Sequence, residues 1–271
     1  MVEPKMKLLD WIPLERLDWE QLTMNPSDGA IDLLEKNYDK IAWEFLLANK
    51  NDKVDKILEK NTERINWDYL SQNRNESYLL KFPECISWNY LSRNPKAIKI
   101  IEKNIKKANW YYLSMNSNAI HLLESNLDKI NWSMLSMNPN AIHLLESNPD
   151  KIDWDAISFN KNAIHLLESN PDKICWYFLS DNQNAIALIE KNLDKICWDR
   201  LSRNPNALSL LKQNQEHICW YWLSKNPSIF EYDYLSAAKE RNAALLQELM
   251  EKTWHPSRMQ KWCLEYNDTY N

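Results

Sequence analysis

The chain has 271 residues and contains 14 Trp but only one Gly, Gly29. Phosphate-binding loops, dinucleotide-binding turns and nucleophile elbows need glycines at fixed offsets, because only glycine tolerates their backbone angles or close approach to a ligand. A single glycine therefore excludes the usual motifs of P-loop NTPases, dinucleotide enzymes and α/β-hydrolases. The net charge is −5 with both signs interspersed, which argues against nucleic acid as the partner because such partners need a concentrated basic surface.

The first predicted region is an N-terminal cap over residues 1–16. Its sequence, MVEPKMKLLDWIP over residues 1–13, has no long apolar segment, so we expect neither a signal peptide nor secretion. No stretch approaches the roughly 18 apolar residues that a membrane helix needs, so no membrane insertion is expected. Five Cys, an odd number without CxxC pairs, argue against a disulfide framework and favour an intracellular protein.

Residues 17–227 contain ten tandem repeats, each anchored on a Trp. The anchors are Trp19, Trp43, Trp67, Trp88, Trp110, Trp132, Trp154, Trp176, Trp198 and Trp220. They are spaced by 24, 24 and 21 residues and then six times by 22. Three residues after each Trp stands Leu or Ile, and six residues after it stands Asn in all ten repeats. Four residues after the Trp stands Ser in eight repeats, Thr23 in another and Leu47 in the exception. This periodicity indicates a repeat architecture.

One repeat, residues 130–148, shows the expected local structure. Asn131 caps a first helix that begins at Trp132 and ends near residue 137, and Ile130 with Leu135 forms a hydrophobic staple. Asn138 breaks the chain, and a second helix begins at Pro139 with an apolar face. A turn, 3₁₀ in one interpretation, leads to the next Trp. The alternative that Asn148 caps a longer first helix stays open, because the sequence does not fix this boundary.

Helices this short are unstable alone, since nucleation is costly and roughly 12–15 residues are needed in water. Each repeat must therefore bury its apolar residues against its neighbours, and the Asn positions would form ladders. We expect an all-α fold, a right-handed solenoid of about ten short two-helix repeats (α/α or α/3₁₀) with a longer helical C-terminal cap. A leucine-rich repeat also has a period near 22 residues, but its L-x-L strand pattern is missing.

Residues 228–271 are predicted to form that helical C-terminal cap and tail. A longer helix over 228–253 would stop before Pro256, and a short second helix would run from Ser257 to about Glu265. Solenoids need such atypical ends to cover their last apolar face. In the alternative interpretation, residues 255–262 bind a partner.

Several strings resemble a known repeat family. NAIHLLESN (118–126), NPNAIHLLESNPDKIDW (138–154) and NPDKICW (170–176) are similar to the NPNAIHLLE-type repeats of about 22 residues encoded by giant nucleocytoplasmic large DNA viruses, the mimivirus and chlorovirus relatives. The two ends of the chain resemble the ends of those proteins. The resemblance implies a viral repeat scaffold, located in the virion or in the host cytoplasm. It implies no activity.

Other rows of residues recur along the array. Cys175, Cys197 and Cys219 precede three successive Trp residues, and His121, His143 and His165 recur in the second helix. Stacked helices lie about 8–10 Å apart, whereas zinc needs ligands at about 2.0–2.3 Å, so we predict no metal site. The Glu and Asp-Lys rows are expected to be solvated faces with weak ion pairs between repeats. No constellation supports catalysis, so no enzyme activity and no cofactor are predicted.

Positions two and five residues after the Trp vary along the array and share one helical face. Where such side chains are exposed, a Met-aromatic patch marks a protein-interaction site; the alternative is that they pack on the adjacent helix. The predicted partner-binding residues are Tyr112, Met115, Met134, Met137, Phe159, Phe178, Arg200, Arg203 and Trp222. The predicted function is a scaffold for viral or host protein partners, with an RNA-binding solenoid as the alternative. The sequence does not specify an oligomeric state.

Overall fold

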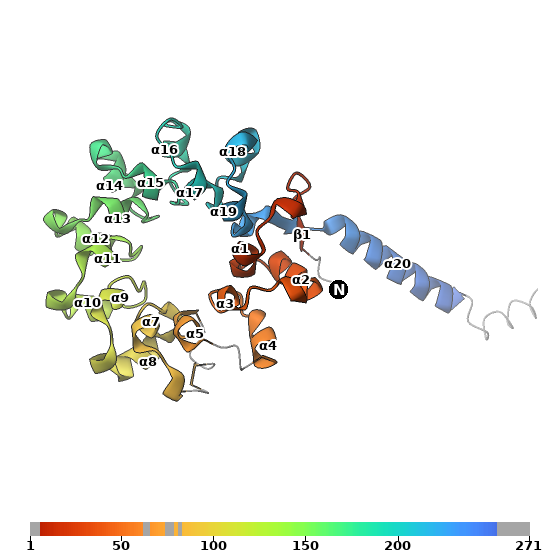
Figure 1. The fold of residues 1–271 in the computed structure, drawn as a ribbon, viewed down its shortest axis with the longest axis horizontal. Coiled ribbons are helices and arrows are strands. Elements are labelled where there is room, and N and C mark those ends of the chain that lie inside the picture. The colour runs from red at the N-terminus through yellow and green to blue at the C-terminus, as the bar shows by residue number, and fades with distance from the viewer. Residues whose placement is uncertain (1–5, 62–65, 74–78, 81–82, 254–271) are drawn as a thin grey trace, which may run out of the picture.

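The computed structural model describes residues 6–61, 66–73, 79–80 and 83–253. It confirms the all-α repeat fold, with short helix pairs recurring along the chain. We number the repeats 1 to 10 from the N-terminus, each beginning with the turn that leads to its Trp, so that repeat 7, for example, spans residues 149–170. The repeats lie side by side around a ring, with the first helices toward the middle and the second helices around the outside (Figure 1).

The first helix of each repeat begins at the Trp in every case. These helices are α1 (Trp19–Met24), α3 (Trp43–Leu46), α5 (Trp67–Asn73), α7 (Trp88–Ser92), α9 (Trp110–Leu113), α11 (Trp132–Ser136), α13 (Trp154–Ser158), α15 (Trp176–Leu179), α17 (Trp198–Ser202) and α19 (Trp220–Ser224). The boundary that the sequence left open is thereby decided in favour of the short first helix.

The second helices are only slightly longer. They are α2 (Asp28–Lys36), α4 (Val54–Glu59), α8 (Ile98–Lys103), α10 (Ile120–Glu124), α12 (Ile142–Glu146), α14 (Ile164–Glu168), α16 (Ile186–Glu190) and α18 (Leu208–Gln213). In most of the regular repeats the second helix begins three residues later than predicted. The preceding Asn explains this: the Asn138 side chain accepts the backbone N–H of Asn140 at 3.0 Å and holds a turn there instead. A 3₁₀ turn then leads to the next Trp, as η8 (Pro149–Lys151) does.

The predicted helix caps are present at several Asn and Asp positions, whereas Ser87 makes no side-chain cap. Asn131 accepts the backbone N–H of Met134 at 2.9 Å, and Asp153 accepts that of Ala156 at 3.0 Å. Cys175 in the same position makes no side-chain cap. The Ser four residues after the Trp connects repeats. The Ser136 hydroxyl donates to the Trp132 carbonyl at 2.8 Å and accepts the backbone N–H of Asp153, in the next repeat, at 3.1 Å.

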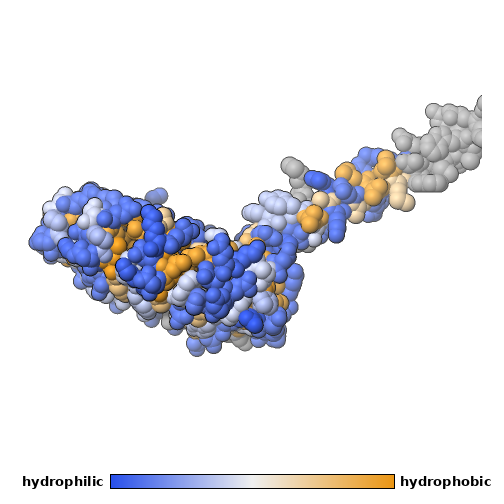
Figure 2. Space-filling view, turned by 90° about the horizontal axis from the view of Figure 1, so that it is seen from above, coloured by the Kyte–Doolittle hydropathy of each residue, from blue (hydrophilic) through white to orange (hydrophobic). Residues whose placement is uncertain are grey.

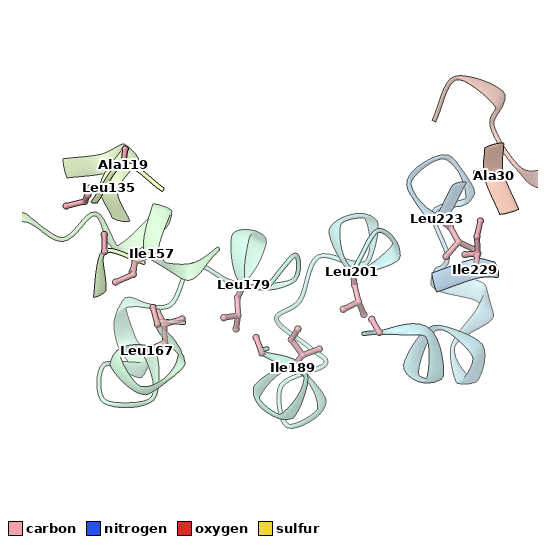
Figure 3. Packing of buried hydrophobic residues seen from close by; sticks show 14 of the residues in the cluster. Ala30, Ala119, Leu135, Ile157, Leu167, Leu179, Ile189, Leu201, Leu223 and Ile229 are labelled. Carbon is pink, nitrogen blue, oxygen red and sulfur yellow. The ribbon is translucent and has the colours of Figure 1, made fainter. Parts of the chain in front are cut away.

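The hydrophobic core passes from repeat to repeat in two clusters, one from Leu79 through repeat 10 to the start of repeat 1 and one from Ile31 to Leu70; Figure 3 shows part of the first. The aliphatic residue three positions after the Trp is 0 % exposed in every repeat. Behind it lie small buried residues such as Ala141 and a second buried row that includes Leu145. The anchoring Trp side chains are only half-buried and pack against the edge of this core. Both the aliphatic row and the Trp row therefore bury apolar surface where the repeats stack.

Buried Asn side chains join successive repeats by hydrogen bonds that form a ladder along the array. Asn160 donates its amide hydrogens to the carbonyls of Ser136 and Asn138 in the preceding repeat, both at 2.9 Å, and the same pair of bonds recurs at Asn49, Asn116, Asn138, Asn182, Asn204 and Asn226. A second, more exposed ladder runs beside it. There Asn162 donates to the Pro139 carbonyl at 2.8 Å.

The array closes on itself. Asn25 of repeat 1 donates to the carbonyls of Ser224 and Asn226 of repeat 10, at 3.0 and 2.9 Å. The backbone N–H of Asp18 donates to the Ser224 hydroxyl at 2.7 Å. Helix α1 packs against α19, and the ring in Figure 1 is complete at this point. The ten repeats of the predicted solenoid thus complete a full turn, with an average rotation of about 36° per repeat.

A short strand pair fastens this junction. Strand β1 (Met6–Leu8) pairs antiparallel with β2 (Phe230–Tyr232), directly after repeat 10. We call this β1–β2 strand pair the clasp. The chain's single glycine, Gly29 in α2, faces it. A Cβ atom built on Gly29 would lie 2.5 Å from the ring of Phe230 and 2.8 Å from Cβ of Met6. The close packing of α2 on the clasp therefore requires glycine.

The C-terminal region differs from the predicted cap. Residues 230–232 are a strand instead of part of the helix, and α20 (Tyr234–Thr253) begins only after it. Helix α20 projects away from the ring (Figures 1 and 2), and its residues from Lys239 to Lys252 are exposed. Repeat 1 covers the end of repeat 10, so the array needs no separate cap there. The second helix predicted at 257–265 lies outside the described residues.

The outer surface is mainly hydrophilic, with a band of hydrophobic residues between the hydrophilic ones (Figure 2). Within the described ranges, no helix combines the length and the apolar character required to cross a bilayer.

Candidate functional site

The variable positions lie on helices and turns that face the middle of the ring. We call the residues two, five and seven positions after each Trp the +2, +5 and +7 rows. The Leu or Ile three positions after each Trp is buried in every repeat, as are the described Asn side chains six positions after it, so the framework fixes where the variable side chains point. Figure 1 places the helices that carry these rows, such as α11 and α13, on the inner side of the ring.

Side chains of the +5 and +7 rows surround one opening. Its cavity volume is about 510 Å³, and residues from repeats 1 to 4 and 7 to 10 line it. Its lining residues are Met24, Pro26, Ala48, Lys50, Gln72, Arg93, Phe159, Asp181, Gln183, Arg203, Pro205, Lys225 and Pro227. Distant parts of the chain reach a common cavity only because the array closes into a ring.

The +2 row mostly packs along the ring, the alternative that the sequence left open. Tyr112 stacks on Tyr90 of the preceding repeat, with ring centroids 6.2 Å apart. Phe178 lies under the guanidinium of Arg200 at 5.6 Å, and Trp222 lies under that of Arg203 at 5.2 Å. These side chains are half-buried.

The remaining predicted residues are half-buried as well: Met115, Met134, Met137 and Phe159. Phe159 and Arg203 are the members of the predicted set that line the opening. The prediction of partner binding itself is not tested by these positions.

Two of the predicted arginines are held by a carboxylate within the chain. The Asp181 side chain is only 3 % exposed, and Arg200 Nη1 lies 2.9 Å from its Oδ2. Arg203 donates through both Nε and Nη2 to the two oxygens of the same carboxylate. Arg200 also donates to the Tyr177 hydroxyl at 2.6 Å. These arginines therefore bridge repeats 8 and 9, which reduces what they offer to a partner.

Two lysines and an arginine at the opening have no such carboxylate. Among the described residues, no ion pair joins Lys50, Arg93 or Lys225 to an acidic side chain, and the Lys225 ammonium approaches the Met24 sulfur at 3.7 Å instead. Lys225 belongs to the +5 row, which varies along the array. Lys50 belongs to the +7 row, which the sequence interpretation did not single out, although its change from Pro to Lys between repeats is visible in the sequence.

Mutual repulsion and desolvation act on these lysines. Lys50 reaches solvent within the opening, yet the surrounding protein desolvates its ammonium and lowers its pKa, and the charges of Arg93 and Lys96 lower it further. Burial also lowers the pKa of Lys225, and the charges of Arg203 and Lys50 add to this effect against the opposing charge of Asp181. Positive charge is thus concentrated at the centre of a chain whose net charge is −5.

The lysines of the Asp-Lys row cover the Trp residues of the preceding repeat. The Lys151 ammonium lies 4.5 Å from the ring centroid of Trp132, and the Lys173 ammonium lies 4.4 Å from that of Trp154. Arg16 covers Trp220 in the same way, at 5.1 Å across the ring junction. These lysines are exposed, as expected for a solvated face, and in addition they form cation–π contacts between repeats.

The residues of the Cys and His rows contact other residues of the chain. The backbone N–H of Cys197 donates to the Ser180 hydroxyl at 2.9 Å, and desolvation raises the pKa of the thiols of Cys175 and Cys219. His143 lies 2.9 Å from Glu124 of the preceding repeat, and His121 and His165 make the same contact with Glu102 and Glu146. In the part of the chain that the structure describes, no three His, Cys, Asp or Glu side chains are grouped to hold a metal.

Comparisons with known proteins add no further constraint: no protein-family model, no curated protein and no solved structure matches this chain.

Proposed function

We propose that the protein is a non-enzymatic binding scaffold that holds a segment of a protein partner at the inner face of its ring. One observation carries this proposal: a constant framework presents side chains of changing identity, and eight repeats direct theirs to one opening. Repeat proteins bind in this way, with specificity in the variable residues of a concave surface.

The chemistry of the opening supports binding more than catalysis. Asp181 is its only carboxylate among the described lining residues, and two arginines already occupy it. Apolar lining residues such as Phe159, Met24 and Pro227 supply contact area, and half-buried Met and aromatic side chains are typical of protein-interaction surfaces.

A viral origin belongs to the same proposal. The repeats resemble those of giant DNA viruses, which supports a scaffold in the virion or one that binds host proteins in the cytoplasm of the infected cell. RNA binding is the competing function. It requires a basic stripe with exposed stacking platforms, whereas the +2 aromatics pack along the ring.

Affinity capture with an inner-face variant tests the proposal. We would compare the wild type with the double variant Met137→Ser, Phe159→Ala, and with Leu127→Ser as the control. Leu127 is apolar and 51 % exposed but lies outside the variable rows. We expect the wild type and the control to capture the same protein after RNase treatment, and the double variant to lose it. Capture that persists in the double variant, or that RNase abolishes, would overturn the proposal.

A further inference from the structure

The opening of the ring concentrates unpaired positive charge from repeats that are far apart in the chain. Lys50 belongs to repeat 2, Arg93 to repeat 4 and Lys225 to repeat 10, and all three line the same cavity. Arg203 adds a fourth cation, but its charge is shared with Asp181. Three cations without a described carboxylate partner therefore face a space of about 510 Å³.

This arrangement is costly for the unliganded ring. Like charges that face one another in a partly desolvated space repel, as the lowered pKa values of Lys50 and Lys225 reflect. Some exposed lysines elsewhere are paired with a carboxylate: Lys53 with Asp28 at 2.7 Å and Lys96 with Asp52 at 2.9 Å. Lys50 and Lys225 have no such partner among the described residues and share one cavity with Arg93 and Arg203, so a ligand that supplies negative charge would relieve this repulsion.

We propose that the opening is an anion site, and that it binds a phosphate group carried by a phosphorylated residue of the protein partner through Lys50, Arg93 and Lys225. A phosphate carries about two negative charges and several strong acceptor oxygens, so one group can pair with cations from three repeats. A single carboxylate would neutralise only one of them. The Phe159 ring and the prolines on the rim of the opening would contact the chain that carries the phosphate.

This inference rests on the inner face being the binding face proposed above, but it concerns different residues. Met137 and Phe159 test the protein contact, whereas Lys50 and Lys225 test the anion. The protein contact and the anion site can therefore be disproved independently of each other.

The repeat pattern offers a matched control. Lys161 occupies the same +7 position in repeat 7 as Lys50 does in repeat 2, and it is exposed but does not line the opening. The variants Lys50→Met, Lys225→Met and Lys161→Met each remove one positive charge and keep a side chain of similar length. Thermal melting of each variant verifies folding. We expect none of them to melt below the wild type, because removal of a repelled charge at the opening relieves strain and removal of Lys161 breaks no described contact.

Titration calorimetry of the full chain with tripolyphosphate, at fixed ionic strength, measures the anion site directly. We expect the wild type and Lys161→Met to bind equally. Lys50→Met and Lys225→Met should each bind about tenfold more weakly or worse, since each loses a charge-assisted contact. No binding by the wild type, or equal binding by all four proteins, would overturn the anion site. Equal binding would not affect the capture result expected for Met137 and Phe159.

Competition then distinguishes the sources of the phosphate. A short peptide with two phosphoserines should displace tripolyphosphate, and its unphosphorylated counterpart should not. Failure of the phosphopeptide to compete would overturn the assignment to a phosphorylated protein. An oligouridylate that competes better than the phosphopeptide, and that loses this ability in Lys50→Met, would overturn it in favour of nucleic acid.

Discussion

The junction between repeats 10 and 1 can be compared directly with an interior junction, such as that between repeats 6 and 7. Both have the same bonds: Asn25 donates to two carbonyls across the closure as Asn160 does in the interior. The partners at the closure are about 200 residues apart and those in the interior about 23. The same hydrogen bonds therefore form at both junctions. The entropic cost of bringing the partners together, however, is larger at the closure, where they are further apart in the chain.

The extra contacts at the closure are explained by this entropy. For a flexible chain, a loop about ten times longer costs about 2 kcal/mol more to close. The closure adds what the interior junctions lack: the β1–β2 pairing, and the packing of Gly29 against Phe230. These contacts, together with the curvature that the stacked repeats already impose, offset the additional entropy.

The largest effect is expected from loss of the ladder Asn. Asn160→Ala and Asn25→Ala each remove two hydrogen bonds between repeats and leave one carbonyl, that of Ser136 or of Ser224, without its partner, which should lower the free energy of unfolding by about 3 kcal/mol in each case. Urea denaturation measures this loss. Small-angle scattering should separate the two variants, because Asn25→Ala weakens the closure and should open the ring. If Asn25→Ala keeps both the stability and the dimensions of the wild type, the ladder does not hold the closure.

The sequence predicts the framework well, because each repeat must satisfy the same local requirements. The Trp row predicted the helix starts, residues before it such as Asn131 predicted the caps, and Leu135 and Asn138 are buried as the pattern required. The pattern did not give the rotation between repeats, on which closure depends. A small change in this rotation would produce an open superhelix from the same contacts.

The candidate site could be predicted only in part, because it too depends on the rotation between repeats. Phe159 and Arg203 were identified from variation along the array. Lys50 and Lys225 come together only when repeat 2 approaches repeat 10, so no spacing in the sequence reports on their proximity. The cation–π contact of Lys173 with Trp154 was missed as well, because it depends on how one repeat sits on the next.

A substitution at the single glycine would perturb the closure alone. Gly29→Ala places a methyl group against the Phe230 ring and the Met6 side chain, and overpacking of this kind costs about 1–3 kcal/mol. Alanine favours the helix by about 1 kcal/mol in return, so the net loss should be smaller than for Asn25→Ala. Thermal melting gives the size of the effect. The control Ser209→Ala, at an exposed position of α18, should leave the melting temperature unchanged, and a Gly29→Ala protein as stable as this control would contradict the tight clasp.

Cation–π contacts allow a finer comparison of the two kinds of junction. Arg16 covers Trp220 at the closure, and Lys173 covers Trp154 in the interior. Each contact should contribute about 0.5–1 kcal/mol, so Arg16→Ala and Lys173→Ala should destabilise the protein equally in urea. A clearly larger loss for Arg16→Ala would mean that the closure is the weaker junction and unfolds first.

The smallest effect is expected from removal of the C-terminal helix. Truncation after Asp233 deletes α20, whose large apolar side chains such as Leu235 and Leu249 are 75 % and 61 % exposed, while the clasp strand β2 remains. Because the ring is closed by repeat 1 and not by this helix, the free energy of unfolding should change by less than about 0.5 kcal/mol. A truncation after Asn226, which also removes β2, is the contrasting variant and should destabilise the closure measurably. If loss of α20 alone were as destabilising as loss of β2, the helix would be acting as the cap that the sequence suggested.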